Sequence, residues 1–171
     1  AQLTAEAVKA LDTEFSPIDN IDCLSCGTTT IDQIAPNHGV MVHGELGSPS
    51  CEVVATAGIC VSGVAALKYI YMGILSGVFE RAISTGSEAG SIYFVKQHFN
   101  GMVNAQKVEE LSKRPEIAFE KEFLRWMLSD GAGAFYLSNQ PAPGKQSLKI
   151  EWINICSYAN EENVCMYAGG E

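Results

Sequence analysis

The feature that most constrains the fold is an alternation of strand-like and helix-like segments along the first half of the chain. Short apolar runs, each followed within two residues by Gly, lie at residues 21–26, 51–56 and 81–85. Longer runs whose apolar residues follow helical spacing lie between and before them, at residues 3–15, 40–46 and 61–78. This alternation is typical of parallel β-α-β units, in which helices cover both faces of one sheet. We therefore predict an α/β fold with a mixed, mostly parallel sheet.

The second half of the chain predicts a different arrangement. Residues 91–128 have an amphipathic helical pattern, which Pro115 divides in two. Two further strand-like runs, at residues 132–138 and 148–157, are joined by a turn rich in Pro and Gly. A short connection favours antiparallel pairing, so we expect these two runs to pair with each other.

Charge and composition exclude some classes of protein. The formal net charge is −9 and no run of basic residues is present, which argues against a nucleic-acid partner. The longest apolar stretch, near residues 59–75, is interrupted by polar residues and Gly, so no membrane span is expected. Charged residues make up 18%, against about 25% in typical domains, which indicates surface buried against a second domain or subunit.

The six cysteines fit a protein with reduced thiols, and we expect a cytoplasmic location without a secretory signal. Cys23 and Cys26 form a CxxC pair, but no second pair lies at zinc spacing. Both fall on a predicted strand, so core packing is the favoured interpretation, and no metal or cofactor is expected. The three histidines, at positions 38, 43 and 98, are predicted to be surface or helix-end residues.

Cys60 is the strongest candidate for chemistry. It follows a predicted strand and Gly58, and it precedes a long apolar helix. The unpaired N–H groups and dipole of a helix N-terminus favour a thiolate, which is the nucleophilic form of cysteine. The alternative is an inert buried thiol at a strand–helix corner.

The sequence resembles the β-ketoacyl-acyl-carrier-protein synthase III family, which are condensing enzymes of the thiolase superfamily. Four stretches carry the resemblance in the family's order, namely residues 27–36, 57–67 (AGICVSGVAAL), 85–88 (TGSE) and 129–134 (SDGAGA). The resemblance implies that residues 1–171 are the N-terminal half of a thiolase-like fold. On this reading the opening strand and the C-terminal half are missing, and about 91–128 is a helical insertion.

The resemblance also implies an activity. Cys60 would accept an acyl group from a thioester of coenzyme A or acyl carrier protein, and a malonyl-type donor would then condense with it. The family uses a His and an Asn for that second step, and both belong to the half that this chain lacks. The fragment alone is therefore expected to be inactive in condensation. The family further implies a homodimer working in fatty acid or secondary-metabolite synthesis, with thioesters as substrates and no other cofactor.

The matched motifs assign further site residues by resemblance. Thr29, Ala35 and Pro36 lie on the family's substrate-binding loop, where many members have an aromatic residue in place of Ala35. The smaller side chain suggests a larger or differently shaped acyl pocket. Gly131 and Gly133 either let the backbone pack close to the active-site helix or form a plain structural turn, which is the favoured interpretation.

Three other functions stay open. The Cys60 acyl group could pass to an oxygen, nitrogen or other carbon nucleophile instead of a malonyl donor. The chain could be a non-catalytic subunit that shapes a partner condensing enzyme. A cysteine hydrolase would need a nearby base, which the sequence does not indicate.

Overall fold

The computed structural model describes residues 1–93, 105–115, 123 and 126–163. The chain divides into two compact units. The first comprises Ala1–Glu88 and Gly131–Asn154, and the second comprises Ala89–Asp130 and Ile155–Glu171. The sheet and Cys60 both belong to the first unit, so the site is built from that unit alone. Among the described residues, no helix combines the length and apolar character needed to cross a membrane.

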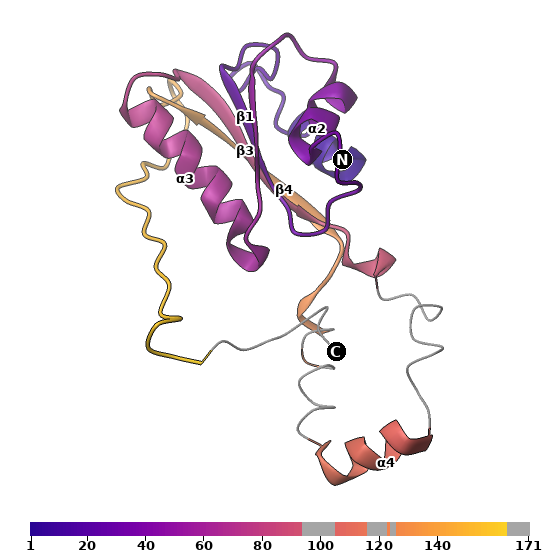
Figure 1. The fold of residues 1–171 in the computed structure, drawn as a ribbon. Helices are drawn as coiled ribbons and strands as arrows, with labels where there is room; N and C mark the ends of the chain where they lie inside the picture. Colours follow the sequence, from indigo (N-terminus) through magenta and orange to yellow (C-terminus); the bar gives the residue numbers. More distant parts are fainter. Residues whose placement is uncertain (94–104, 116–122, 124–125, 164–171) are drawn as a thin grey trace. The chain divides into compact units, whose positions relative to one another are not determined.

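A four-stranded sheet forms the centre of the first unit (Figure 1). In spatial order its strands are β2 (Glu52–Thr56), β1 (Cys23–Gly27), β3 (Arg81–Glu88) and β4 (Gly131–Ser138). The first three are parallel, and β4 is antiparallel to β3. The predicted mixed, mostly parallel sheet is therefore confirmed. In the register Gly27 pairs with both Thr56 and Gly86, so β1, β2 and β3 reach the same edge, which we call the carboxyl edge.

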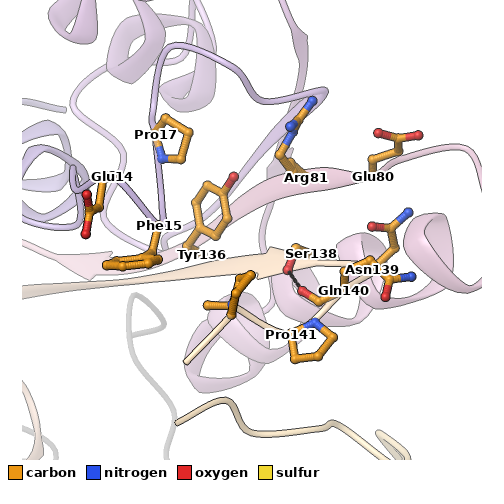
Figure 2. Close-up of a pocket in the computed structure, with 12 residues that line it drawn as sticks. Glu14, Phe15, Pro17, Glu80, Arg81, Tyr136, Ser138, Asn139, Gln140 and Pro141 are labelled. Atoms are coloured by element: carbon orange, nitrogen blue, oxygen red, sulfur yellow. Dashed lines mark hydrogen bonds between the residues drawn. The ribbon is translucent and has the colours of Figure 1, made fainter. Parts of the chain in front are cut away.

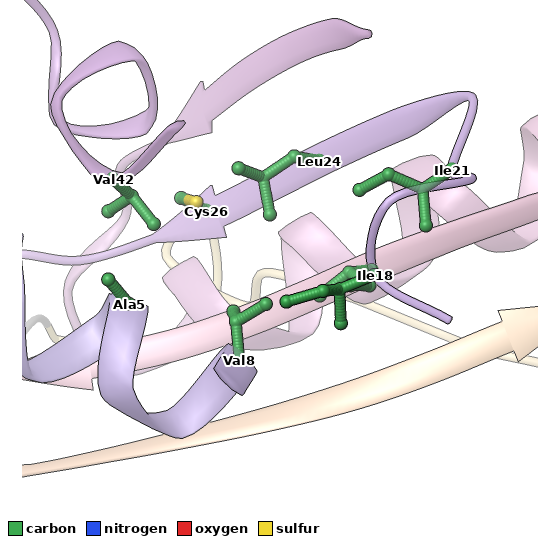
Figure 3. Packing of buried hydrophobic residues seen from close by; sticks show 8 residues of the cluster. Ala5, Val8, Ile18, Ile21, Leu24, Cys26 and Val42 are labelled. Carbon is green, nitrogen blue, oxygen red and sulfur yellow. The ribbon is translucent and has the colours of Figure 1, made fainter. Parts of the chain in front are cut away.

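Helices cover both faces of the sheet, as predicted. α1 (Gln2–Lys9) and α2 (His38–Leu46) lie on one face, and α3 (Ser62–Leu75) lies on the other (Figure 1). Alternate side chains of a strand point to opposite faces. The first face has a core of eight residues, Ala5, Val8, Ile18, Ile21, Leu24, Cys26, Val42 and Ile83 (Figure 3). Under α3 the core is smaller and consists of Cys23, Ile70, Phe79 and Ala82.

The ends of α1 and α2 follow from local chemistry. The Asn37 side chain accepts a hydrogen bond from the N–H of Val40 and caps the start of α2. Gly47 ends that helix in the left-handed conformation, with φ of 63°. α1 stops at Lys9 rather than near residue 15, because Thr13 and Ser16 close a turn through their side chains and backbone.

The strand predicted at residues 148–157 is wrong. These residues form no strand, and Leu148 and Trp152 are 89% and 77% exposed. The antiparallel partner of β4 is β3, which lies before the 89–130 segment in the sequence. Alternating apolar residues indicate an extended chain, but a strand also needs a neighbouring backbone. Here the hydroxyl of Tyr71 on α3 donates to the carbonyl of Glu151 at 2.9 Å.

The described part of the second unit holds a 3-10 turn (Gly90–Ile92) and α4 (Ala105–Lys113). The Asp130 carboxylate accepts bonds from the backbone N–H and the hydroxyl of Ser91, at 2.8 and 2.5 Å. Much of the helix predicted over 91–128 falls on residues 94–104, 116–122 and 124–125, which lie outside the described residues, as does His98. The helical insertion therefore stays a prediction.

Candidate functional site

Cys60 lies in a 3-10 turn (Ile59–Val61) between the end of β2 and the start of α3. Its side chain is exposed, unlike those of Cys23 and Cys26. Ile59, the preceding residue, has φ of 54°, a left-handed conformation that is a true outlier for a β-branched side chain. Strained backbone of this kind gathers at functional sites, where the surrounding structure must hold it. The turn thus presents an exposed thiol from a constrained backbone.

Three hydrogen bonds connect this turn, Thr56 and the loop after β1 at the carboxyl edge. The N–H of Val61 donates to the carbonyl of Gly58 at 3.1 Å. The hydroxyl of Thr56, the last residue of β2, donates to the carbonyl of Ser62 at 2.8 Å. The carbonyl of Thr56 in turn accepts from the N–H of Thr28 at 3.3 Å. Thr56 therefore joins the Cys60 turn to the loop that follows β1.

Close packing of glycines brings the start of α3 onto the sheet. A Cβ atom added to Gly27 would lie 2.4 Å from the carbonyl oxygen of Ser62 and 2.6 Å from the nitrogen of Gly63. A Cβ on Gly86 would lie 3.5 Å from the Cα of Gly63. Only a residue without a side chain fits at the end of β1. The sequence analysis used Gly27 and Gly86 as strand ends and missed this role.

Glu88, the last residue of β3, holds the loop that contains Thr29. Its carboxylate accepts from the N–H of Thr29 at 2.8 Å, and from the N–H and hydroxyl of Thr30 at 3.0 and 2.7 Å. Thr29 is thereby placed at the carboxyl edge, next to the loop residue that bonds Thr56. The sequence analysis quoted Glu88 within a motif but assigned it no role. The sequence did contain a signal for this role, namely an acidic residue at the end of one strand and a Thr-rich loop after another.

Ala35 and Pro36 lie on the exposed segment that leads into α2, and the peptide bond between them is cis. α2 packs on the face of the sheet opposite α3. The assignment of both residues to an acyl pocket stays a prediction.

Gly131 and Gly133 do not form the structural turn that was the favoured interpretation. They are the first and third residues of β4, so they belong to a strand rather than to a turn. A Cβ atom at either position would meet no described atom within 4 Å. In this chain the sheet and the start of α3 approach each other closely at Gly27, Gly63 and Gly86 instead. The role of Gly131 and Gly133 near the site stays a prediction.

His38 is the first residue of α2, so the predicted helix-end position is confirmed, but its side chain is buried rather than at the surface. Its side chain is 4% exposed, and Nε2 lies 3.3 Å from the hydroxyls of both Thr4 and Ser87. Those hydroxyls also bond each other at 2.8 Å. Burial lowers the pKa of His38, because the charged ring loses its hydration there. The cluster ties α1, α2 and β3 together. His43, in contrast, lies in the last turn of α2 and contacts the carbonyl of Pro49.

The CxxC pair serves the core, as the sequence analysis favoured. Cys26 belongs to the core beneath α1 and α2, whereas Cys23 belongs to the core beneath α3. Two thiols on opposite faces of a sheet cannot share one metal ion. Burial raises the pKa of Cys23 to about 12 and that of Cys26 to about 11, so both stay protonated. Nowhere in the described part of the chain do three metal-binding side chains gather.

A hollow of about 430 Å³ lies at the other end of the sheet (Figure 2). Phe15, Arg81 and Tyr136 line it together with the turn after β4. Arg81 begins β3, whereas the Cys60 turn follows the end of the parallel strand β2. The hollow is therefore at the opposite edge of the sheet from Cys60, and Cys60 is not among the residues that line it.

Neither a family model nor a curated protein matches this sequence. Solved structures do match. The 3-oxoacyl-(acyl carrier protein) synthase III, FabH, of Pseudomonas aeruginosa PAO1 is 19% identical with a TM-score of 0.56, over 82% of this chain and 37% of its own. A Glu-to-Gln variant of OleA from Xanthomonas campestris is 19% identical with a TM-score of 0.64, over 80% and 40%.

A Cys-to-Ser variant of OleA, with bound lauric acid and lauroyl-CoA, is 17% identical with a TM-score of 0.64, over 80% of this chain and 39% of its own. The chain thus has a thiolase-like fold, and it spans about two fifths of the length of the structures it matches. The predicted fold of one half is confirmed.

Proposed function

We propose that this chain is the nucleophile-bearing half of a thiolase-fold condensing enzyme, in which Cys60 takes up the acyl group of a thioester. The observation that carries the proposal is the Cys60 turn itself. An exposed thiol follows a residue with φ of 54°, at the carboxyl edge of parallel strands and at the start of a helix. Strand-to-helix turns of this kind present nucleophiles in other enzyme folds.

The chemistry begins with acyl transfer. The Cys60 thiolate attacks the thioester carbonyl, the old carbon–sulfur bond breaks, and the thiol of coenzyme A or of a carrier protein leaves. The N–H of Cys60 can donate to the oxyanion that forms on the way. A malonyl-type donor then loses CO2, and its carbanion attacks the acyl group and releases Cys60. We propose that the residues for this second step belong to the other half of the thiolase-like fold.

The solved structures support thioesters as the substrate class. The OleA variant holds lauroyl-CoA, and the name of FabH is 3-oxoacyl-(acyl carrier protein) synthase III. We propose an acyl-CoA or acyl carrier protein as the donor, without a further cofactor. Ala35 in place of an aromatic residue favours a larger acyl pocket.

The outer surface of α3 supports a covering second half. Val64, Met72 and Leu75 follow helical spacing and are 43%, 50% and 69% exposed in this chain. An apolar row of this kind normally faces another protein layer. We propose that the C-terminal half of the same fold packs there and completes the site around Cys60.

The free edge of β2 supports a homodimer. β2 is one of the two edge strands of the sheet, and among the described residues its one pairing partner is β1. An uncovered edge strand exposes unpaired backbone groups that another chain can bind. We propose that a second copy pairs there, and that the protein works in the cytoplasm, where its described free thiols stay reduced.

Intact-protein mass spectrometry tests the proposal. The full-length protein that contains this chain is incubated with acyl-CoA and acyl-carrier-protein thioesters of several lengths. We expect one acyl adduct, which Cys60→Ala abolishes and Cys156→Ala retains. Cys156 is the matched control because its thiol is also exposed.

The other outcomes separate the alternatives. An adduct that is released to alcohols or amines, and not to malonyl thioesters, identifies a different acyltransferase. No adduct from any donor, with the protein folded, identifies a non-catalytic partner subunit and contradicts the proposal.

A further inference from the structure

The loop after β1 and the Cys60 turn are joined by a continuous series of hydrogen bonds that begins at Glu88. The Glu88 carboxylate accepts from the N–H groups of Thr29 and Thr30, at 2.8 and 3.0 Å, and from the Thr30 hydroxyl at 2.7 Å. One side chain thus satisfies three donors on the loop. Hydrogen bonds to a charged acceptor are about twice as strong as neutral ones, so this end of the series is its firm anchor.

The series continues through Thr56. The N–H of Thr28, the residue before the anchored pair, donates to the Thr56 carbonyl at 3.3 Å. The Thr56 hydroxyl then donates to the carbonyl of Ser62 at 2.8 Å. Ser62 is two residues after Cys60 and is the first residue of α3. In this series Thr56 is therefore the single residue that connects the loop at residues 28–30 to the Cys60 turn, and a displacement of the loop would also displace the turn.

The need for such support follows from the strained backbone. Ile59 has φ of 54°, and a conformation of this kind persists only where the surrounding structure holds it. Within the turn, the N–H of Val61 donates to the carbonyl of Gly58 and the N–H of Ser62 donates to the carbonyl of Ile59. The turn needs contacts from outside to stay in place, and Thr56 supplies one of them.

We propose that Glu88 is a positioning residue, which holds the Thr28–Thr30 loop and, through Thr56, the Cys60 turn in the orientation for acyl transfer. The inference rests on the proposed acyl transfer to Cys60. Glu88 acts through other residues and does not touch the acyl group. The oriented thiol matters because a displacement of about 1 Å at a reacting atom can lower a rate by about a hundredfold.

Two variants of the full-length protein test this order of contacts. Glu88→Gln keeps the shape of the side chain but replaces one acceptor oxygen with a donor group. Thr56→Val keeps the shape of Thr56 and removes only its bond to Ser62. Glu80→Gln is the matched control, because Glu80 precedes the opposite end of β3 and is exposed.

Amide hydrogen exchange is measured over residues 28–30 and 59–63. In Glu88→Gln we expect exchange at least about tenfold faster in both segments, since a bond to a charged group is lost. In Thr56→Val we expect the faster exchange in residues 59–63 alone, while Thr29 and Thr30 keep their protection. Glu80→Gln should match the wild type in both segments.

Two reactions of Cys60 then separate orientation from general loosening. Acyl-adduct formation should slow by about ten- to a hundredfold in Glu88→Gln and Thr56→Val, because it needs an oriented thiol. Alkylation by iodoacetamide, which needs only an exposed thiol, should change little. Equal slowing of both reactions would overturn the positioning role.

Wild-type exchange in residues 59–63 of Glu88→Gln, together with wild-type acylation, would also overturn the inference. If Glu88→Gln does not fold, Thr56→Val decides whether the series supports the turn. Failure of the proposed function has a different signature, because the wild-type protein itself then forms no acyl adduct with any thioester. The exchange pattern still decides in that case whether Glu88 holds the turn.

Discussion

The helices on the two faces of the sheet differ in how much apolar surface they leave exposed. On one face, α1 and α2 bury Leu24, Val42 and Ile83 completely, and a buried histidine cluster ties the layers together. On the other face α3 buries its inner side, but its outer side remains apolar and exposed. α2 has a side-chain cap at its start, whereas α3 has none. A helix with apolar residues on all sides is typical of an interior layer, which α3 becomes only when something covers it.

The largest expected effect comes from the close contact between the sheet and α3. Gly27→Ala places a Cβ 2.4 Å from backbone atoms of Ser62, so the helix start must move. We expect a loss of about 3 kcal/mol in the free energy of unfolding, at the upper end for overpacking. Chemical denaturation of the full-length protein measures it.

Gly44→Ala is the matched control on α2. A Cβ there meets nothing within 4 Å, and alanine favours a helix over glycine by about 1 kcal/mol. The control should therefore be stabilised. A Gly27→Ala protein as stable as the wild type would mean that α3 is not seated tightly on the sheet.

An intermediate effect tests whether the outer side of α3 is covered. Leu75 is 69% exposed in this chain, but a second half packed on α3 would bury it. We then expect Leu75→Ala to lower the free energy of unfolding of the full-length protein by about 2 kcal/mol.

A smaller truncation to alanine on the outer side of α2 gives the contrast. Val40 is 46% exposed, and Val40→Ala should change the stability by less than about 0.5 kcal/mol. Thermal or chemical unfolding of both variants provides the comparison. If Leu75→Ala is as neutral as Val40→Ala, then α3 is open to solvent and the proposed second half does not pack there.

The smallest effect is a dependence of stability on pH, and it arises on the face of the sheet that α1 and α2 cover. Burial lowers the pKa of His38 below its ordinary value of 6.5, so the unfolded chain binds a proton more readily than the folded one. The stability is then fully present above pH 6.5 and declines as the pH falls below it. The size should be on the order of 1 kcal/mol per unit of pKa difference.

His38→Gln should flatten this decline between pH 7 and about pH 5, the range that the ordinary pKa of histidine defines. His43→Gln is the control, because His43 lies on the same helix with its ring outside the core. Unfolding curves at several pH values measure the slope. A slope unchanged by His38→Gln and lost in His43→Gln would contradict the assignment.

The sheet was predictable because its signals are local. Each parallel strand is a short apolar run with a Gly near its end, and each helix has its own spacing of apolar residues. Residues 148–157 failed for a physical reason, since their alternation indicates an extended chain but says nothing about a pairing partner. Tyr71 supplies one bond there, to Glu151, and no ladder forms.

The candidate site was predictable only at its centre. Cys60 could be located from its place between a strand and a helix. The burial of His38 was not predicted because its partners, Thr4 and Ser87, come from two other elements of the fold. Glu88 was missed for the same reason, since its three bonds span more than half of the first unit's sequence. Such contacts depend on the register of the strands, which no single segment reveals.

The pairing of β3 with β4 has a consequence for which changes of sequence this fold can tolerate. Glu88 and Gly131 are opposite each other in the ladder, so the segment between them leaves and rejoins the sheet at neighbouring positions. Lengthening a loop whose ends already meet costs little, about 0.6 kcal/mol for each doubling. The segment is therefore well placed for replacement by another sequence. It can be exchanged for a tight hairpin turn, or for a larger module, while the strands and the Cys60 turn keep their places.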